Sequence, residues 1–345
     1  MIPIINGHII APHNLSSIDS VVAAQIRIKK GEARAILPGE LETYPFYESV
    51  KSRSRSFDLA RRERVDSILE KHINRDTRFD DRKLRFSGCS FLPSPEPAGG
   101  KVLEIAFGPS HFEEHLATNN RCLQDANFYA RLAAVGQRDF NDPFAYLANN
   151  LAMNAVLRTS DDRYMLGLRS KSQRFYPGYW HNIGGFYEAS QLDLFDLEDN
   201  GQAIVRTFKE RMLKELMQEA KVQPESVSSL RMIAITYGLS SVDINYDART
   251  DADSEYIIRT GHFKAKDQDE HTGFRGVTFG ELVDVLEGKK ILDLQEGVVE
   301  KPSSQNREFT KVVPLGLGGL LVHIGLQDPE ALDRIIRAPQ HQYPL

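Results

Sequence analysis

The chain of 345 residues is long enough to bury a sizeable core, and its length predicts two domains or one domain with a large extension. Its apolar content of 41% and charged content of 26% are typical of a globular protein, and its net charge of −5 argues against nucleic acid or anionic membranes as partners. The two cysteines, the lack of a long apolar run and the lack of a signal-peptide pattern together predict a cytoplasmic protein without a disulfide framework.

The first part of the chain predicts an N-terminal α/β extension. The elements expected there are an isoleucine-rich strand near the start, a helix over 57–73, a hairpin of strands 84–92 and 101–107, and a helix after Ser110. The chain changes character near Asp142-Pro143, so we place a domain boundary there. The predicted domains are therefore residues 1–145 and 146–345.

The second part predicts strands around a central helix, that is, a mixed α/β or α+β domain. In chain order we expect a hairpin over 153–168, the glycine pair Gly184-Gly185, a helix over 204–221, a strand over 230–238, an aspartate-rich loop over 243–253, a strand over 254–265, a helix over 279–286, and a helix or strand over 315–324. Arg169 and Arg174 follow the hairpin in a basic cluster and could bind phosphate, although a solvated basic loop explains them equally well.

The helix over 204–221 carries two acidic residues close to its core-facing side. Its apolar stripe consists of Val205, Phe208, Met212, Leu216 and Ala220. At about 100° per residue Glu219 falls within this stripe, and Glu215 lies one turn earlier at its edge. Two like charges on a core-facing surface are unfavourable unless a cation pairs with them, so the pair predicts half of a metal site. The alternative is a helix edge where both carboxylates reach water.

The glycine pair and this helix together resemble the Nudix hydrolase family. The family signature reads Gly-x5-Glu-x7-Arg-Glu-U-x-Glu-Glu-x-Gly-U, where U is a bulky apolar residue. The positions that match are Glu215, Leu216, Glu219 and Val222, and the positions that depart from it are Lys214, Gln218 and Lys221. The loop after Gly185 is longer than in the family, and the first signature glutamate has no counterpart. The order of elements over 146–326 resembles that of the Nudix family. The degenerate signature, the long N-terminal extension, a strand start at Ser254-Glu255-Tyr256 and the segment 107–119 look most like the UDP-glucose/UDP-galactose diphosphatases of this family.

This resemblance implies an α/β/α sandwich with a mixed sheet and a hydrolase that cleaves a nucleotide-sugar or another nucleoside diphosphate-linked small molecule. It implies magnesium, with manganese as the alternative, held by Glu215 and Glu219. It further implies that Glu219 or Glu255 accepts a proton during catalysis. Gly184, Gly185, Arg169 and Arg174 would then bind the substrate.

Two other functions remain open from the sequence. The missing signature glutamates would suit a Nudix-fold module that binds a nucleotide without cleaving it. The segment His111-Phe112-Glu113-Glu114-His115 fits the zinc-peptidase pattern His-x-x-Glu-His, but a helix start with acidic residues explains its glutamates as well. Glu255 also has a simpler interpretation, as an exposed glutamate at the end of a strand.

Overall fold

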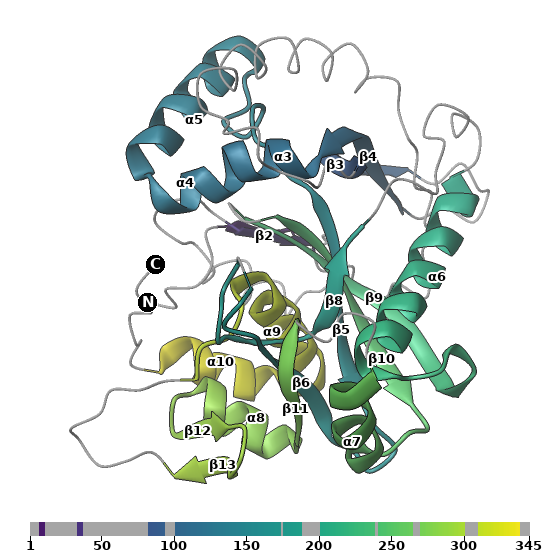
Figure 1. Cartoon of the computed structure of the whole chain (residues 1–345). Coiled ribbons are helices and arrows are strands. Elements are labelled where there is room, and N and C mark those ends of the chain that lie inside the picture. Colours follow the sequence, from purple (N-terminus) through teal and green to yellow (C-terminus); the bar gives the residue numbers. More distant parts are fainter. Residues whose placement is uncertain are drawn as a thin grey trace.

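The computed structural model shows a mixed α/β protein (Figure 1). The residues it describes are 7–10, 33–36, 82–93, 101–173, 175–187, 201–238, 241–264, 270–300 and 310–338. The helix predicted over 57–73 and the side chain of Arg174 lie outside these residues.

A mixed sheet of nine strands organises the described residues, with strand order β1-β2-β9-β10-β5-β6-β11, while β8 pairs with β5 and β7 pairs with β6. The strands are β1 Gly7–Ile10, β2 Ala33–Ile36, β5 Leu151–Arg158, β6 Tyr164–Arg169, β7 Trp180–His181, β8 Ile183–Phe186, β9 Val227–Tyr237, β10 Val242–Thr250 and β11 His271–Val277. Strands β10 and β5 are parallel, whereas β5 and β8 are antiparallel. The predicted hairpin over 153–168 is confirmed as β5 and β6.

Helices cover both faces of this sheet (Figure 1). On one face lie α6 Gly201–Ala220 and α7 Ser254–Lys264, and on the other lie α8 Phe279–Leu286, α9 Pro314–Gln327 and α10 Pro329–Arg337. Successive residues of a strand point to opposite faces, so Met153 packs in the α6 core while Val156 packs in the α9 core. The expected α/β/α sandwich is therefore confirmed.

Local signals account for several helix positions. The predicted stripe of α6 is confirmed for its four described members, because Phe208, Met212, Leu216 and Ala220 are all 0% exposed. The side chain of Val205 lies outside the described residues. Helix α8 begins with a capping box in which Thr278 and Glu281 bond each other's backbone. The segment 315–324, predicted as a helix or a strand, is helical and belongs to α9. Most of the residues of α9 are buried.

The N-terminal part is attached to the main sheet at several points. Its elements are the hairpin β3 Arg82–Pro93 and β4 Lys101–His111, then α3 Phe112–His115, a π-helical turn Leu116–Asn120, α4 Arg121–Gln124 and α5 Ala126–Phe140. Leu84 and Phe86 belong to the core shared with α6, and β1 and β2 extend the sheet beside β9. The hairpin prediction is confirmed, while the division at residue 145 stays a prediction.

The region over 243–265 differs from the prediction. The expected aspartate-rich loop is β10, and the expected strand over 254–265 is helix α7. Strand β10 was missed because its polar residues are buried against partners that are distant in the sequence, as Asn154 is from Asp243. Helix α7 was missed because of its Tyr256-Ile257-Ile258 run, but Asp253 accepts a hydrogen bond from the Tyr256 N–H at 2.7 Å and so stabilises the helix start.

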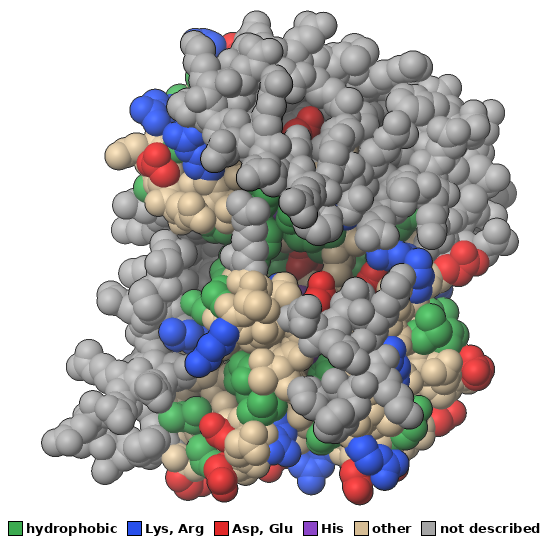
Figure 2. Space-filling model, viewed as in Figure 1, with side chains coloured by type: hydrophobic (Ala, Val, Ile, Leu, Met, Phe, Trp, Pro, Cys, Tyr) green, Lys and Arg blue, Asp and Glu red, His purple; other side chains and the backbone are tan. Residues whose placement is uncertain are grey.

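The remaining described elements are a 3₁₀ turn Pro224–Ser226 and the small hairpin of β12 Lys290–Asp293 and β13 Gly297–Glu300. Within the described ranges, no helix is both long enough and apolar enough to cross a membrane. Acidic and basic side chains are interspersed on the described part of the face in Figure 2, which shows no broad basic patch there.

Candidate functional site

The glycine pair on β8 lets the carboxylates of α6 approach the sheet closely. The Gly184 N–H donates a hydrogen bond to Oε2 of Glu219 at 3.2 Å. A Cβ atom at Gly184 would overlap the carbonyl oxygen of Met153 on the paired strand β5. A Cβ atom at Gly185 would lie 3.1 Å from Oε2 of Glu215, which is tighter than ordinary packing. Both glycines are therefore needed for close approach.

Both helix carboxylates are buried, so the alternative of a solvent-exposed helix edge is wrong. Glu215 is 6% exposed and Glu219 is 4% exposed. Their surroundings differ, because Arg211 forms an ion pair with Glu215 at 2.7 Å, between two nearly buried side chains. Glu215 thus has a cation beside it already, and Glu219 faces a different set of neighbours.

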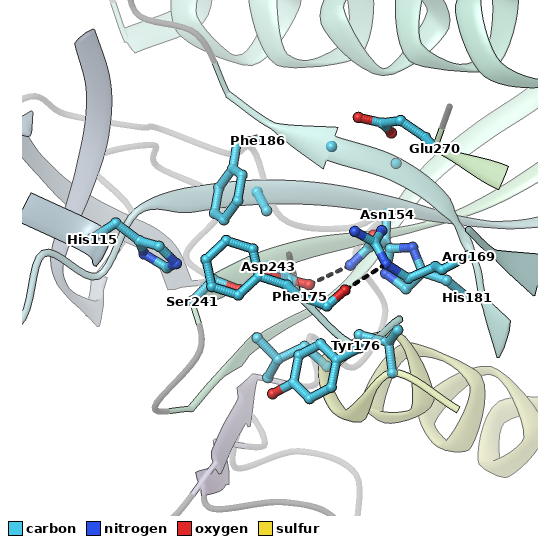
Figure 3. A pocket seen from close by; sticks show the side chains of 15 residues that line it. His115, Asn154, Arg169, Phe175, Tyr176, His181, Phe186, Ser241, Asp243 and Glu270 are labelled. Carbon is cyan, nitrogen blue, oxygen red and sulfur yellow. Dashed lines mark hydrogen bonds between the residues drawn. The ribbon is translucent and has the colours of Figure 1, made fainter. Parts of the chain in front are cut away.

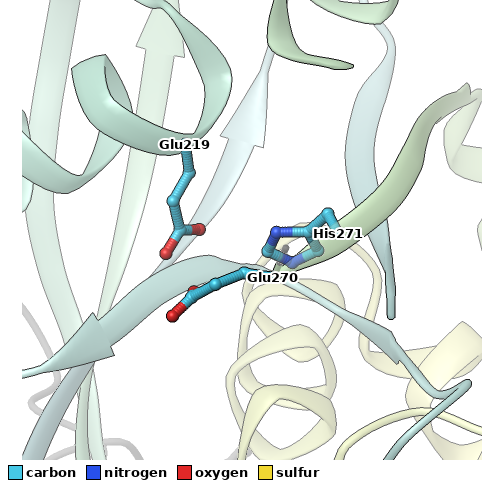
Figure 4. A group of neighbouring side chains, drawn as sticks. All are labelled: Glu219, Glu270 and His271. Carbon is cyan, nitrogen blue, oxygen red and sulfur yellow. The ribbon is translucent and has the colours of Figure 1, made fainter. Parts of the chain in front are cut away.

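Glu219, Glu270 and His271 form a group that could hold a metal ion, here named the acidic group (Figure 4). One ligand atom from each residue lies within 4.8 Å of the others, and Glu219 and His271 are buried while Glu270 is partly buried. Sequence reasoning missed Glu270 and His271. Their only signal is an acidic stretch before a strand, and nothing in its spacing relates it to α6.

The electrostatics of this group fit a cation. Burial raises the pKa of Glu219 well above its ordinary value, and the charges of Glu270 and Glu215 raise it further. Burial, followed by the nearby Arg169, lowers the pKa of His271 to about 3, so its imidazole is neutral. Among the described residues the Nε2 atom of His271 has no hydrogen-bond partner. Two crowded carboxylates and a neutral imidazole form a donor set that suits a divalent metal.

Arg169 is fixed beside this group instead of lying in a solvated loop. Its Nε donates to the carbonyl oxygen of Phe175 at 3.0 Å, and its Nη2 donates to Gln173 at 3.2 Å. Burial lowers the pKa of the Arg169 guanidinium, and Glu270 and Glu219 partly offset this effect. A guanidinium remains charged in this setting, so it places positive charge next to the acidic group.

A pocket of about 120 Å³ opens beside these residues (Figure 3). Its lining includes Arg169, Glu270, Gly184 and Gly185, and the other lining residues are His115, Ala152, Asn154, Phe175, Tyr176, His181, Phe186, Ser241, Asp243, Val313 and Leu315. The pocket therefore joins the predicted substrate-binding glycines and Arg169 to the acidic group. It also has an aromatic wall that could contact a flat ring.

The N-terminal part contributes His115 to this wall. The ring of His115 lies 5.0 Å from that of Phe186 and 5.3 Å from that of Phe175. Burial, followed by the charge of Lys83, lowers the pKa of His115 to about 3. Glu114 accepts a hydrogen bond from Ser110 at 2.9 Å. The side chain of His111, the first histidine of the zinc-peptidase pattern, lies outside the described residues. Among the side chains that are described, no metal-holding group includes His115 or Glu114.

Glu255 is not brought to the pocket. It is exposed at the start of α7, where the neighbouring Ser254 donates to Asp161 at 2.6 Å. Asp161 lies in the turn between β5 and β6, at the opposite end of β6 from Arg169. The expected strand that would have carried Glu255 toward the candidate metal site is a helix that begins at the far end of the hairpin.

One curated protein matches the chain in sequence. The uridine diphosphate glucose pyrophosphatase NUDT22 of Bos taurus is 28% identical over 161 residues, which cover 46% of this chain and 53% of that protein. The chain resembles Nudix proteins of the UDP-sugar type. It spans about half the length of the curated relative it matches. No family model matches the chain.

Three solved structures are also similar over part of the chain. DR0079 from Deinococcus radiodurans is 18% identical, covers 44% of this chain and 76% of its own, and has a TM-score of 0.27. A MutT protein from Methanosarcina mazei Go1 is 15% identical, covers 39% of this chain and 79% of its own, and has a TM-score of 0.26. An Ap4A hydrolase of C. elegans is 11% identical, covers 39% of this chain and 83% of its own, and has a TM-score of 0.24. Superpositions this weak add nothing to the assignment of the site.

Proposed function

We propose that the chain hydrolyses the diphosphate bond of a nucleoside diphosphate-linked compound, with a UDP-sugar as the substrate. The products would be a nucleoside monophosphate and a sugar 1-phosphate. The observation that carries the proposal is the group of Glu219, Glu270 and His271, which lies against the glycine strand beside a pocket that Arg169 lines. The similarity to a protein named as a UDP-glucose pyrophosphatase supports the choice of substrate.

A divalent metal, magnesium or manganese, would neutralise charge on the phosphoryl oxygens when bound. Glu219, Glu270 and His271 would hold it, and Glu215 would act as a further carboxylate if it were released from Arg211. The proposed ligand set thus keeps Glu219 and Glu215 from the sequence and adds two residues.

Arg169 would bind a phosphate oxygen, because a guanidinium provides a planar set of donors that matches phosphate. Its hydrogen bonds to Phe175 and Gln173 hold it in place before substrate arrives, so little side-chain freedom is lost on binding. Gly184 and Gly185 would allow the diphosphate to lie close to the backbone of β8. We retain Arg174 as a second phosphate partner on the basis of the sequence alone.

Of the two proton acceptors that the sequence suggested, we propose Glu219. It lies in the acidic group at the pocket, whereas Glu255 is exposed at the far end of the β5–β6 hairpin. Residues 1–145 would complete the pocket, because His115 belongs to its aromatic wall.

A second function is a module that binds a nucleotide without cleaving it. The ion pair of Arg211 with Glu215 favours this alternative, because a carboxylate that is already neutralised binds a metal more weakly. Gln218, which stands where the family has a glutamate, favours it as well.

The deciding experiment is a hydrolysis assay with UDP-glucose, ADP-ribose and a panel of nucleotides, in magnesium, in manganese and in EDTA. We expect metal-dependent release of UMP from UDP-glucose, and a rate at least about a hundredfold lower for Glu219→Gln. Glu210→Gln is the matched control, because Glu210 is an exposed glutamate on the same helix. Tight binding of UDP in a calorimeter without turnover of any substrate would establish the binding module in place of the hydrolase.

A further inference from the structure

A second carboxyl group lines the pocket and is not part of the group of Glu219, Glu270 and His271. Asp243 on β10 is 4% exposed and lines the pocket (Figure 3). Its Oδ1 accepts a hydrogen bond from the Ser241 hydroxyl at 2.8 Å, and its Oδ2 accepts one from the Asn154 amide. Two neutral donors, Asn154 on β5 and Ser241 just before β10, therefore fix the orientation of this carboxyl.

The position of Asp243 is unfavourable for the fold. Burial raises the pKa of Asp243 to about 6, and the hydrogen bonds from Ser241 and Asn154 offset only part of that effect. Among the described residues no ion pair includes Asp243. A buried charge without a cation destabilises a protein, so a role in the pocket is a better explanation than packing.

The chemistry of a carboxylate limits what it can bind. An ionised carboxylate only accepts hydrogen bonds, and each of its oxygens has room for more than one. It repels phosphate, which the guanidinium of Arg169 attracts. The pocket thus has one part suited to the diphosphate, beside Arg169 and the acidic group, and another part suited to a neutral group with N–H or O–H donors.

We propose that Asp243 is a specificity-determining residue that accepts a hydrogen bond from an N–H or O–H of the nucleoside or the sugar of the substrate. This inference rests on the proposed function and adds the orientation of the substrate to it. Ser241 and Asn154 are positioning residues that hold the carboxylate toward the ligand. A site built around a hydrogen bond to a charged group discriminates by about ten- to a hundredfold against a ligand that cannot make it.

The test is Asp243→Asn, with the kinetics of UDP-glucose hydrolysis and the calorimetric affinity for UDP in the presence of magnesium. The asparagine amide can accept from Asn154 and donate to Ser241, so the local network survives while the charged acceptor is lost. We expect KM for UDP-glucose to rise about tenfold or more while kcat changes less than about threefold. Asp247→Asn is the control, because Asp247 lies on the same strand, bonds Arg231 and His323, and is not part of the pocket lining. Its KM should stay at the wild-type value.

The outcomes separate the two proposals. Weaker binding of both UDP and UDP-glucose places the donor on the nucleoside, and weaker binding of UDP-glucose alone places it on the sugar. Unchanged constants for both ligands overturn the role of Asp243 and leave the hydrolase intact. A wild-type protein that binds without cleaving, and binds more weakly after Asp243→Asn, refutes hydrolysis and retains the role of Asp243. If the wild type neither binds nor cleaves, both proposals fail.

A second variant covers the case in which Asp243→Asn does not fold. Ser241→Ala removes one of the two hydrogen bonds that orient the carboxylate and keeps the charge itself. We expect a smaller rise in KM, of about three- to tenfold, with kcat unchanged. Wild-type KM and UDP affinity in this variant would contradict the proposal.

Discussion

Replacing Asp243 by asparagine should stabilise the protein relative to the wild type as the pH rises. In the folded protein burial raises the pKa of Asp243 from 3.8 to about 6. A carboxyl whose pKa is raised on folding favours the folded state below its unfolded pKa, and this advantage is lost as the pH rises through its folded pKa. Asparagine cannot ionise, so the free energy of unfolding of the variant does not fall at high pH through ionisation at this position, whereas that of the wild type does.

The size of the effect follows from the two pKa values. The shift from 3.8 to about 6 corresponds to about 3 kcal/mol of unfolding free energy in total. Most of this, about 2 kcal/mol, should develop between about pH 4 and about pH 7.5. The causes of the shift are burial and two neutral hydrogen bonds, with no charged neighbour among them. The difference between variant and wild type therefore isolates Asp243 from the other titrating groups.

The assay is urea unfolding of both proteins across this pH range, with the fluorescence of the single tryptophan, Trp180, as the signal. Linear extrapolation gives the unfolding free energy of each protein at each pH. The free energy of unfolding of the variant should exceed that of the wild type by an amount that increases with pH. A difference that stays constant with pH, or that shrinks toward neutral pH, would show that Asp243 is not a buried, destabilising carboxylate.

The remaining predictions concern the glycine strand and the acidic group. Glu219→Gln should lower metal-dependent hydrolysis of UDP-glucose at least about a hundredfold while the free energy of unfolding stays equal or rises, because burial raises the pKa of this carboxyl; equal rates would refute the site. Gly184→Ala should destabilise by roughly 1–3 kcal/mol in chemical unfolding, whereas Gly280→Ala, where a Cβ meets nothing within 4 Å, should be neutral or stabilising. Glu255→Gln should leave kcat within about twofold of the wild type, and a large decrease in kcat would indicate that Glu255 takes part in catalysis. Manganese or magnesium should raise the melting temperature of the wild type, and the rise should be smaller for Glu270→Gln in a thermal shift assay.

Features governed by short-range patterns were predictable from the sequence. The spacing of apolar residues predicted helix α6 and the burial of Glu219, since helical periodicity needs only neighbouring residues. The same reasoning predicted the β3–β4 and β5–β6 hairpins, which join segments adjacent in the chain. The glycine pair entered the prediction through the resemblance to the Nudix family, and both glycines line the pocket.

Only the tertiary structure shows which residues distant in the sequence lie together at the candidate site. Glu270 and His271 meet Glu219 across a segment of chain whose spacing carries no periodic signal. Asp243 looked like part of a polar loop because its partner Asn154 is 89 residues away. The Ile257-Ile258 pair favoured a strand that would have brought Glu255 to the candidate metal site, whereas the segment is a helix whose start is capped by Asp253. The sequence thus predicted the helix and the glycine strand on which the candidate site lies. Which polar groups are buried together depends on contacts between segments that are remote along the chain, because only the packed sheet brings them within bonding distance.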